Sequence, residues 1–570
     1  MQEIVNYGKM CPNPVFERKN YVFLTGEWRF SFSLSEEEPV FDRKIVVPYS
    51  YECEASGIGD GTMHECVWYE RELEIKPHEG RIHLCFEGVD YHCFVYVNGN
   101  LACEHRGGYT SFFTDITDLV NTGTNTLRVK VLDDFSGAQL RGKQRRKSSN
   151  YDCWYIQTTG IWKPVWLEYC GSNPLKRIFF SPENDGTVCF EGETEYEAQA
   201  EIEIFEEGKS ICTQRLETVS KLLSGKVKLN NPRLWDIENP FLYEVKIRVF
   251  GESTDEVSTY FAFREVNTDE NGVYINGKKV YLRMILAQGY WKNTMLTAPD
   301  ETALEKDILL AKKLGFNGIR MHQKVESNVF YYLCDKLGMY VWGEIPSAYE
   351  YTDRMKREFG EDCLKIVRQL KAYPCIIAWV IFNESWGIPE IKNNRECQLY
   401  VESIQKKVRF EDPTRLIVIN DGWHQLNGDL LTLHEYEQNA ETLLKEYRDK
   451  NYVVGEKLIN QNHWGKSFAD NYTYSHQAVI ISEFGGVAMV RDDGWGYGDK
   501  ASDLEEYRVR VTGLVSALKR IDYLSGFCYT QLTDVQQETN GLLTIERKPK
   551  LPLECIRNIF AFEKNAQRED

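Results

Sequence analysis

The chain has 570 residues, too many for one ordinary domain, and its 42% hydrophobic content is ample for two to four buried cores. Its formal net charge of −18 argues against nucleic acid and anionic membranes as partners, because both carry the same sign of charge. No apolar run approaches the roughly 20 residues of a membrane span. Residues 1–6 lack the basic and apolar regions of a signal peptide, so we expect a cytoplasmic protein.

Sixteen cysteines are scattered singly along the chain, and none forms a C-x-x-C pair. That spacing argues against zinc sites and redox motifs. Several of them lie inside apolar runs, as Cys85 and Cys375 do. We therefore expect buried free thiols, with no metal site and no cofactor.

Up to about residue 265 the pattern is that of β-structure. Short alternating runs recur at 67–75, 81–89, 91–99 and 125–133, and Asn98-Gly99 is a hairpin-turn signal. A second block of strands spans about 175–265, with turns at the two Asn-Pro pairs, 231–232 and 239–240. Strands at this spacing predict β-sandwiches.

After about residue 266, apolar runs alternate with amphipathic helical stretches such as 300–314 and 327–338. Eight such runs in about 300 residues predict a (β/α)8 barrel. The eight runs are 280–286, 315–321, 340–345, 376–382, 416–421, 430–436, 478–484 and 526–532.

Polar residues appear repeatedly where these apolar runs stop. Parallel barrel strands are buried on both faces, and their carboxyl ends open onto the catalytic face. Any one of these residues could be a helix cap, but their recurrence predicts a ring of polar groups at one end of the barrel. The members are Arg320, His322, Glu344, Asn383, Glu384, Asp421, His434, Glu435, Tyr436, Glu483, Gln531 and Asp534.

Two of these residues, Glu384 and Glu483, end the fourth and seventh runs. A barrel would bring both strand ends to one site, although many residues separate them in sequence. Paired carboxylates suit glycoside cleavage, in which one protonates the leaving oxygen while the other attacks or activates water. Trp386, Trp423, Trp495 and Tyr436 could offer surfaces for sugar stacking, although ordinary packing is the commoner role for any one aromatic residue.

These segments resemble glycoside hydrolase family 2. "AWVIFNESWG" (378–387) and "VIISEFGG" (479–486) are similar to its acid/base and nucleophile signatures. "GEWRF" (26–30), "HRGGYTSFFTDIT" (105–117) and "TTGIWKPVWLE" (158–168) resemble its N-terminal sugar-binding domain, and "FAFREV" (261–266) resembles the junction into its barrel. The resemblance implies a jelly-roll β-sandwich over 1–172, an immunoglobulin-like β-sandwich over 173–266 and a catalytic barrel over 267–570.

The resemblance also implies roles for individual residues. Glu384 would be the general acid/base and Glu483 the nucleophile, while Asn383 would bind the sugar 2-hydroxyl. Arg320 and Tyr436 would hold Glu483 ionised and oriented. The remaining implied substrate-binding residues are His322, His434, Trp386, Trp495 and Asn540; no metal ligand is implied.

The sugar is the least determined feature. Glucuronidases of the family carry an Asn-x-Lys pair after the eighth strand, and here Asn540 is followed by Leu542 where we expect lysine. We also find no counterpart of the magnesium ligands of the large β-galactosidases. We therefore expect a retaining exo-β-glycosidase for neutral sugars, with β-galactoside first. β-Glucuronide, β-glucoside, α-L-arabinopyranoside and a non-catalytic carbohydrate-binding role remain open, as does a homo-oligomer.

Overall fold

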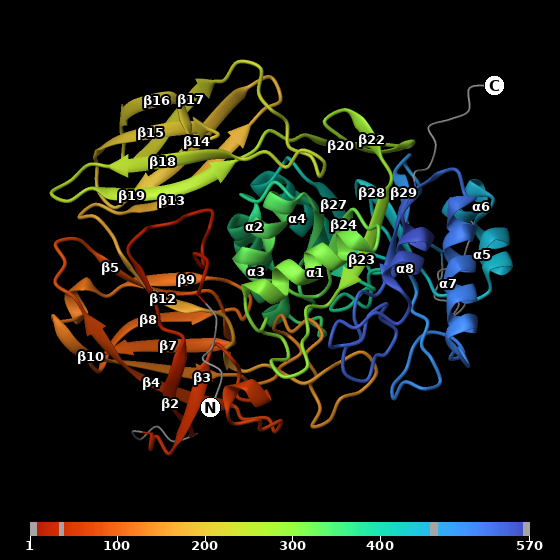
Figure 1. Cartoon of the computed structure of the whole chain (residues 1–570), viewed down its shortest axis with the longest axis horizontal. Helices are drawn as coiled ribbons and strands as arrows, with labels where there is room; N and C mark the ends of the chain where they lie inside the picture. The colour runs from red at the N-terminus through yellow and green to blue at the C-terminus, as the bar shows by residue number, and fades with distance from the viewer. Residues whose placement is uncertain (1–7, 34–38, 456–465, 563–570) are drawn as a thin grey trace.

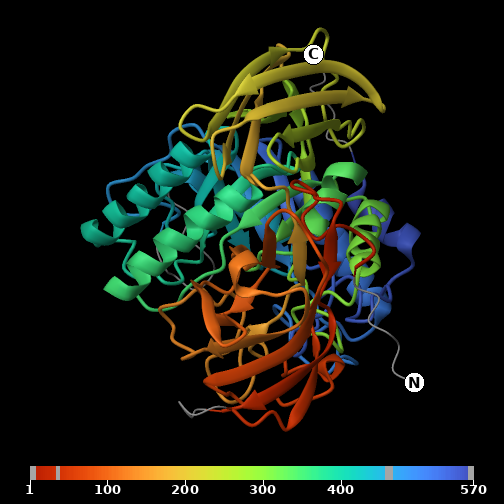
Figure 2. The same ribbon diagram turned by 90° about the vertical axis from the view of Figure 1, so that its left-hand side faces the viewer.

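A computed structural model describes residues 8–33, 39–455 and 466–562. Figure 1 shows two β-rich parts beside a larger part in which helices surround a barrel of strands. When the molecule is turned, the two β-rich parts lie one above the other, with the N-terminal one below (Figure 2). No described helix is both long and apolar enough to cross a membrane.

The N-terminal part is a sandwich of a six-stranded sheet, ordered β3-β2-β4-β10-β7-β8, and a four-stranded sheet, ordered β1-β12-β5-β9. Its core is built from the inward residues of these alternating strands. The predicted hairpin forms between β7 and β8, where Asn98 and Gly99 have φ of 49° and 80°. The elements are β1 (Tyr21–Phe23), β2 (Gly26–Phe32), β3 (Arg43–Val47), η1 (Glu54–Ser56), β4 (Cys66–Ile75), β5 (Ile82–Phe86), β6 (Val89–Asp90), β7 (His92–Val97), β8 (Asn100–Arg106), β9 (Phe112–Asp115), η2 (Thr117–Leu119), β10 (Gly123–Leu132), β11 (Gly160–Ile161) and β12 (Val165–Tyr169).

The second part is a smaller sandwich with its own core. A three-stranded sheet, β13-β14-β17, faces a four-stranded sheet, β16-β15-β18-β19, in the manner of an immunoglobulin-like domain. A three-stranded antiparallel sheet then leads into the barrel. The strands are β13 (Leu175–Pro182), β14 (Thr187–Thr194), β15 (Gln199–Glu206), β16 (Lys209–Glu217), β17 (Leu222–Lys228), β18 (Tyr243–Val249), β19 (Asp255–Phe261), β20 (Val266–Asp269), β21 (Gly272–Ile275) and β22 (Lys278–Val280).

The third part is the predicted (β/α)8 barrel, and every one of the eight predicted strands forms. Its ladder runs β27-β26-β25-β24-β23-β30-β29-β28, so β27 and β28 are the strands at which it stays open. The strands are β23 (Leu282–Ala287), β24 (Gly318–Met321), β25 (Tyr340–Glu344), β26 (Ile376–Asn383), β27 (Leu416–Asp421), β28 (Leu430–Glu435), β29 (Ala478–Gly485) and β30 (Leu524–Thr530). The helices are α1 (Glu301–Lys313), α2 (Asn328–Leu337), α3 (Asp353–Leu370), α4 (Arg395–Glu411), α5 (Ala440–Tyr447), α6 (Lys450–Gly455), α7 (Leu504–Lys519) and α8 (Leu553–Phe560).

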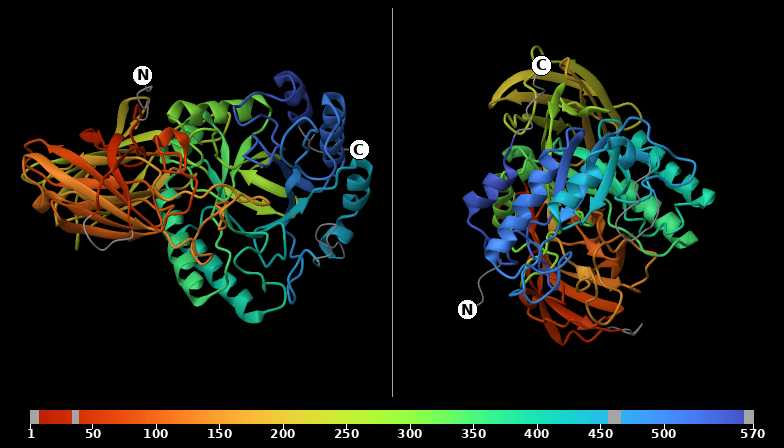
Figure 3. Two further views of the ribbon diagram at one scale, coloured as in Figure 1. Left: turned by 90° about the horizontal axis from the view of Figure 1, so that it is seen from below. Right: turned by 90° about the vertical axis from the view of Figure 1, so that its right-hand side faces the viewer.

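A long connection of the N-terminal sandwich reaches the barrel. We call residues 133–159, between β10 and β11, the crossing loop; it runs beneath the barrel in Figure 1 and between the two parts in the left view of Figure 3. Arg141 and Gly142 donate backbone hydrogen bonds to the Ser347 carbonyl at 3.0 and 3.1 Å. Gly142 has φ of 57°, and a Cβ there would lie 2.1 Å from the Gln323 carbonyl oxygen, so only glycine permits this approach.

The β-rich parts are joined to each other through Arg18, which lies in the segment before β1. Its buried guanidinium contacts Glu168 of β12 at 2.6 Å and Asp255 of β19 at 2.9 Å. Removing a partner from such a buried pair is strongly destabilising, since it leaves an uncompensated charge. Arg18 therefore fixes the position of the second sandwich against the first.

Candidate active site

Arg320 lies at the centre of the polar groups at the carboxyl ends of the barrel strands. It comes from β24 and is fully buried. Its guanidinium contacts Glu344 at 2.7 Å, Asp421 at 2.5 Å and Glu483 at 3.0 Å. A fourth contact, 2.7 Å long, goes to the amide oxygen of Asn383. One arginine thus organises the ends of four other strands.

Glu483 is buried and held through both carboxylate oxygens. Arg320 donates to Oε1, and the hydroxyl of Tyr436 donates to Oε2 at 2.5 Å. Burial raises the pKa of Glu483, but the charges of His434 and Arg320 outweigh it and hold the pKa below its usual value. Glu483 is therefore ionised near neutral pH, as a nucleophilic carboxylate must be.

His434 bridges Glu384 and Asp421, with 2.8 Å from its Nδ1 to Glu384 Oε1 and 2.8 Å from its Nε2 to Asp421 Oδ2. Burial alone would lower its pKa, but Glu483 and Asp421 raise the pKa to about 10. His434 is therefore a protonated imidazolium that donates from both nitrogens. One nitrogen of His434 and one carboxylate oxygen each of Glu384 and Glu483 lie within 4.8 Å of one another, a spacing found among metal ligands, and both His434 nitrogens are already engaged by Glu384 and Asp421.

The same spacing brings one carboxylate oxygen of Glu384 within 4.8 Å of one of Glu483. This bound is compatible with the roughly 5–5.5 Å between carboxyl groups of retaining glycosidases. Glu384 directly follows β26 in the left-handed region, with φ of 49°. That turn directs the end of an otherwise apolar strand into the site.

Asn383 has a donor to spare. Its amide oxygen accepts from Arg320, while its buried Nδ2 has no hydrogen-bond partner among the described residues. A buried unsatisfied donor costs on the order of 1–3 kcal/mol, so such groups usually have a reason. Nδ2 is free to bind a ligand hydroxyl.

The other sequence-predicted residues lie around this centre. His322 follows β24 and contacts Glu344, while Trp386 packs against Trp154 of the crossing loop at 5.7 Å between ring centroids. Trp495 donates its indole N–H to the Asp152 carbonyl at 3.0 Å, again on the crossing loop. Asn540 is fully buried and accepts from Gln531 at 2.8 Å.

Several residues of the site lie outside the set that the sequence predicted. Lys143, Cys153 and Tyr155 come from the crossing loop, and Glu538 comes from the segment 531–552 between β30 and α8. The hydroxyl of Tyr155 donates to Glu538, and the ammonium of Lys143 lies 4.7 Å from the centroid of the Trp386 ring. Their sequence surroundings have no strand or helix period, so no pattern singled them out.

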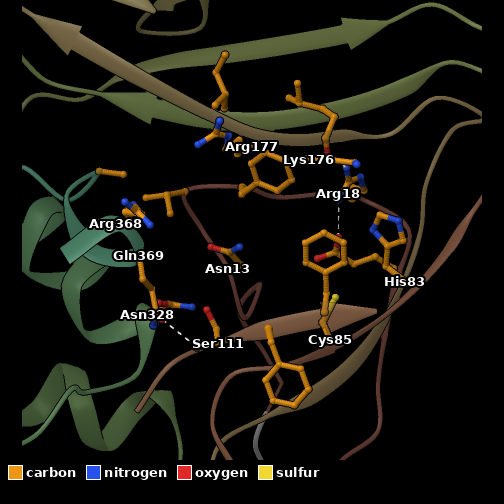
Figure 4. A pocket seen from close by; sticks show the side chains of 18 of the residues that line it. Asn13, Arg18, His83, Cys85, Ser111, Lys176, Arg177, Asn328, Arg368 and Gln369 are labelled. Carbon is orange, nitrogen blue, oxygen red and sulfur yellow. Dashed lines mark hydrogen bonds and ion pairs between the residues drawn. The ribbon is translucent and has the colours of Figure 1, made fainter. Parts of the chain in front are cut away.

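A cavity of about 370 Å³ lies elsewhere, at the junction of the three parts (Figure 4). None of the residues at the strand ends lines it. Its cations are already paired, Arg18 with Glu168, Arg177 with Glu193 at 3.0 Å and Arg368 with Glu411 at 2.7 Å. Because these cations are paired with carboxylates of the protein itself, we interpret this cavity as space left where the three domains pack together.

A parallel barrel that presents two close glutamates beside a buried arginine has the arrangement expected of a retaining glycoside hydrolase. Three family models match the chain in order. The sugar binding domain of glycosyl hydrolases family 2 matches residues 31–169, a second model of that family matches 177–264, and its TIM barrel domain matches 266–564. The chain belongs to glycosyl hydrolases family 2.

Among curated relatives, a putative β-glucuronidase of Formosa agariphila is 25% identical over 78% of this chain and 54% of its own length. A β-galactosidase of Thermoanaerobacter pseudethanolicus is 24% identical over 75% of the chain and 59% of its own length. The chain thus spans a little over half the length of these relatives. Among solved structures, a β-glucuronidase of Bifidobacterium dentium has a TM-score of 0.78 at 17% identity, covering 96% of this chain and 98% of the other.

Proposed function

We propose that this protein is a retaining exo-β-glycosidase that cleaves terminal neutral β-linked sugars, with β-galactosides as the first substrates to test. The observation that carries the proposal is the pairing of Glu384 and Glu483 at the ends of β26 and β29, with oxygens within 4.8 Å. In the first step Glu483 attacks the anomeric carbon while Glu384 gives its proton to the departing oxygen. In the second step Glu384 takes a proton from water, which attacks the same carbon and releases Glu483.

The surrounding contacts support these roles. Tyr436 and Arg320 hold the Glu483 carboxylate in place, which suits a nucleophile that must stay ionised. The spare donor of Asn383 suits a sugar 2-hydroxyl, a contact that strengthens in the transition state. Both features would be unnecessary in a barrel that served only as a scaffold.

The preference for a neutral sugar is supported by the residues at and near the sequence position where a carboxylate-binding lysine is expected. Leu542 is buried and apolar, and Arg547 is engaged by Asp307 at 2.8 Å, while Lys548 is exposed. None of these three residues offers a buried, available cation to a sugar carboxylate. The second candidate is a β-uronide, favoured by the β-glucuronidase names of several relatives.

Trapping of the covalent intermediate tests the proposal. A 2-deoxy-2-fluoro-β-galactosyl fluoride slows both steps but keeps a good leaving group, so the glycosyl-enzyme should accumulate. Peptide mass spectrometry should then find the fluorosugar on Glu483, and Glu483→Gln should abolish labelling. Turnover with inversion of the anomeric centre, or labelling of Glu384, would contradict the proposed roles.

A further inference from the structure

Two buried groups of opposite charge near the catalytic glutamates have no role in the chemistry above. Lys143 lies on the crossing loop and is 7% exposed, and Glu538 lies in segment 531–552 and is 2% exposed. Burial alone would lower the pKa of Lys143, but Cys153, Glu538, Glu483 and Glu384 outweigh burial and raise the pKa above its usual value. Lys143 is therefore a cation within electrostatic range of Glu538 and of both catalytic glutamates.

These two charges do not close into an ion pair. Among the described residues, no carboxylate oxygen comes within 4.0 Å of the Lys143 ammonium, which instead faces the ring of Trp386. Glu538 is held by three neutral donors, the hydroxyl of Tyr155, the amide of Asn540 at 3.0 Å and the amide of Gln288 at 3.5 Å. The two charges thus influence each other electrostatically without a direct ion pair between them.

Other buried lysines of the described chain do have an oxygen partner. Lys324 contacts Glu326 at 2.5 Å, Lys550 contacts Asp534 at 2.8 Å, and Lys163 donates to the Glu326 carbonyl at 3.0 Å. The Lys143 ammonium hydrogen-bonds the sulfur of Cys153 and faces the Trp386 ring, and neither is the oxygen acceptor that a desolvated ammonium loses with its water. Of these four buried lysines, Lys143 lacks an oxygen acceptor among the described residues, and a bound ligand would supply one.

The chemistry of a ligand that would contact both residues follows from the signs of their charges. It must accept a hydrogen bond from the ammonium and donate one to the carboxylate, and a hydroxyl does both. A sugar carboxylate would satisfy Lys143 but carry the same charge as Glu538, and a sugar ammonium would do the reverse. Resting on the proposed glycosidase function, we propose that Lys143 and Glu538 together bind hydroxyls of a neutral sugar and reject uronic and amino sugars.

The crossing loop holds Lys143 in position before any sugar arrives. Its backbone carbonyl accepts from the Tyr155 amide at 2.8 Å, and the two residues before it are anchored on the Ser347 carbonyl. A group fixed in its binding geometry loses little entropy when the ligand binds. The specificity of the barrel's chemistry would then be set partly by the neighbouring sandwich.

The test compares kcat/KM for nitrophenyl β-galactoside and β-glucoside with that for the matching β-galacturonide and β-glucuronide. The unmodified protein should prefer the neutral sugars. Glu538→Gln keeps the shape and removes the charge, so the uronide-to-neutral ratio should rise at least about 10-fold. Lys143→Met should lower kcat/KM for neutral sugars by about 30-fold or more.

Lys163→Met is the matched control, because Lys163 is also buried and also faces an indole ring, that of Trp162 at 4.8 Å, away from the catalytic glutamates. It should leave the uronide-to-neutral ratio unchanged even if the protein becomes less stable. If a variant does not fold, inhibition of the unmodified protein by free galactose, galacturonic acid and galactosamine gives the same comparison. Galactose should inhibit most strongly.

A preference of the unmodified protein for uronides would overturn the inference. A uronide-to-neutral ratio that Glu538→Gln leaves unchanged would also overturn it. So would inhibition by galacturonic acid or galactosamine that is as strong as inhibition by galactose. These outcomes differ from failure of the proposed function, in which no glycoside of the panel is cleaved and no fluorosugar is trapped on Glu483. If the fluorosugar is trapped on Glu483 but the uronide-to-neutral ratio does not respond to Glu538→Gln, only the roles of Lys143 and Glu538 are rejected.

Discussion

Tyr436→Phe provides a direct test of how the nucleophile is kept ionised. The substitution removes one hydroxyl that donates to Glu483 Oε2 at 2.5 Å and leaves the ring, which stacks on Tyr497 with centroids 3.3 Å apart. A hydrogen bond to a charged group contributes on the order of 1.5–3 kcal/mol. At about 1.36 kcal/mol per pKa unit, its loss should raise the pKa of Glu483 by roughly 1–2 units.

The consequence should appear in the pH dependence of kcat/KM. Glu483 acts only when ionised, so activity falls as pH drops through its pKa, and a higher pKa moves this acidic limb to higher pH by the same roughly 1–2 units. The assay is hydrolysis of an aryl β-galactoside across the acidic range. Tyr507→Phe, which alters a buried tyrosine of α7, is the control. An acidic limb that stays in place would refute the assignment of Tyr436 as the residue that keeps Glu483 ionised.

Three further substitutions give separate expectations. Glu384→Gln should slow substrates with poor leaving groups far more than those with good ones, because only the former need a proton; equal losses in a leaving-group series would count against Glu384 as the acid. Arg18→Met should lower the free energy of unfolding by about 3–5 kcal/mol in urea denaturation, and a negligible loss would show that its buried pairs contribute little. Gly142→Ala should displace the crossing loop, because its Cβ meets the Gln323 carbonyl, and so reduce kcat/KM for neutral sugars. Unchanged activity would mean that the loop position does not matter.

The barrel could be predicted because its strands are buried on both faces and therefore form continuous apolar runs. For the same reason, the polar residues that end them, such as Asn383 and Glu384 after β26, could be predicted to gather at one end. Arg320 was predicted as a support for Glu483, yet its additional contacts to Glu344 and Asp421 depend on strand order around the ring, which the sequence does not state.

Lys143 and Glu538 could not be predicted in the same way. Each lies in an irregular connection, where no period of two or 3.6 residues marks a buried side chain. Lys143 reaches the site only because the crossing loop docks on the loop after β25, a contact between residues about 200 positions apart along the chain. The resemblance to the family's Asn-x-Lys pair concerns Leu542, which is buried and apolar, whereas the buried carboxylate of this segment is Glu538.

The docking of the crossing loop means that two domains contribute residues to one site. The proposed proton donor and nucleophile belong to the barrel, whereas Lys143 lies on a loop that leaves the sandwich and packs into the core of the barrel through Ala138, Leu140 and Tyr155. If Lys143 has the role proposed above, mutations that shift the crossing loop should alter which sugar is accepted while leaving bond cleavage intact. In evolution, substrate specificity would then change through substitutions in the loop of a neighbouring domain, while the two glutamates of the barrel stay the same.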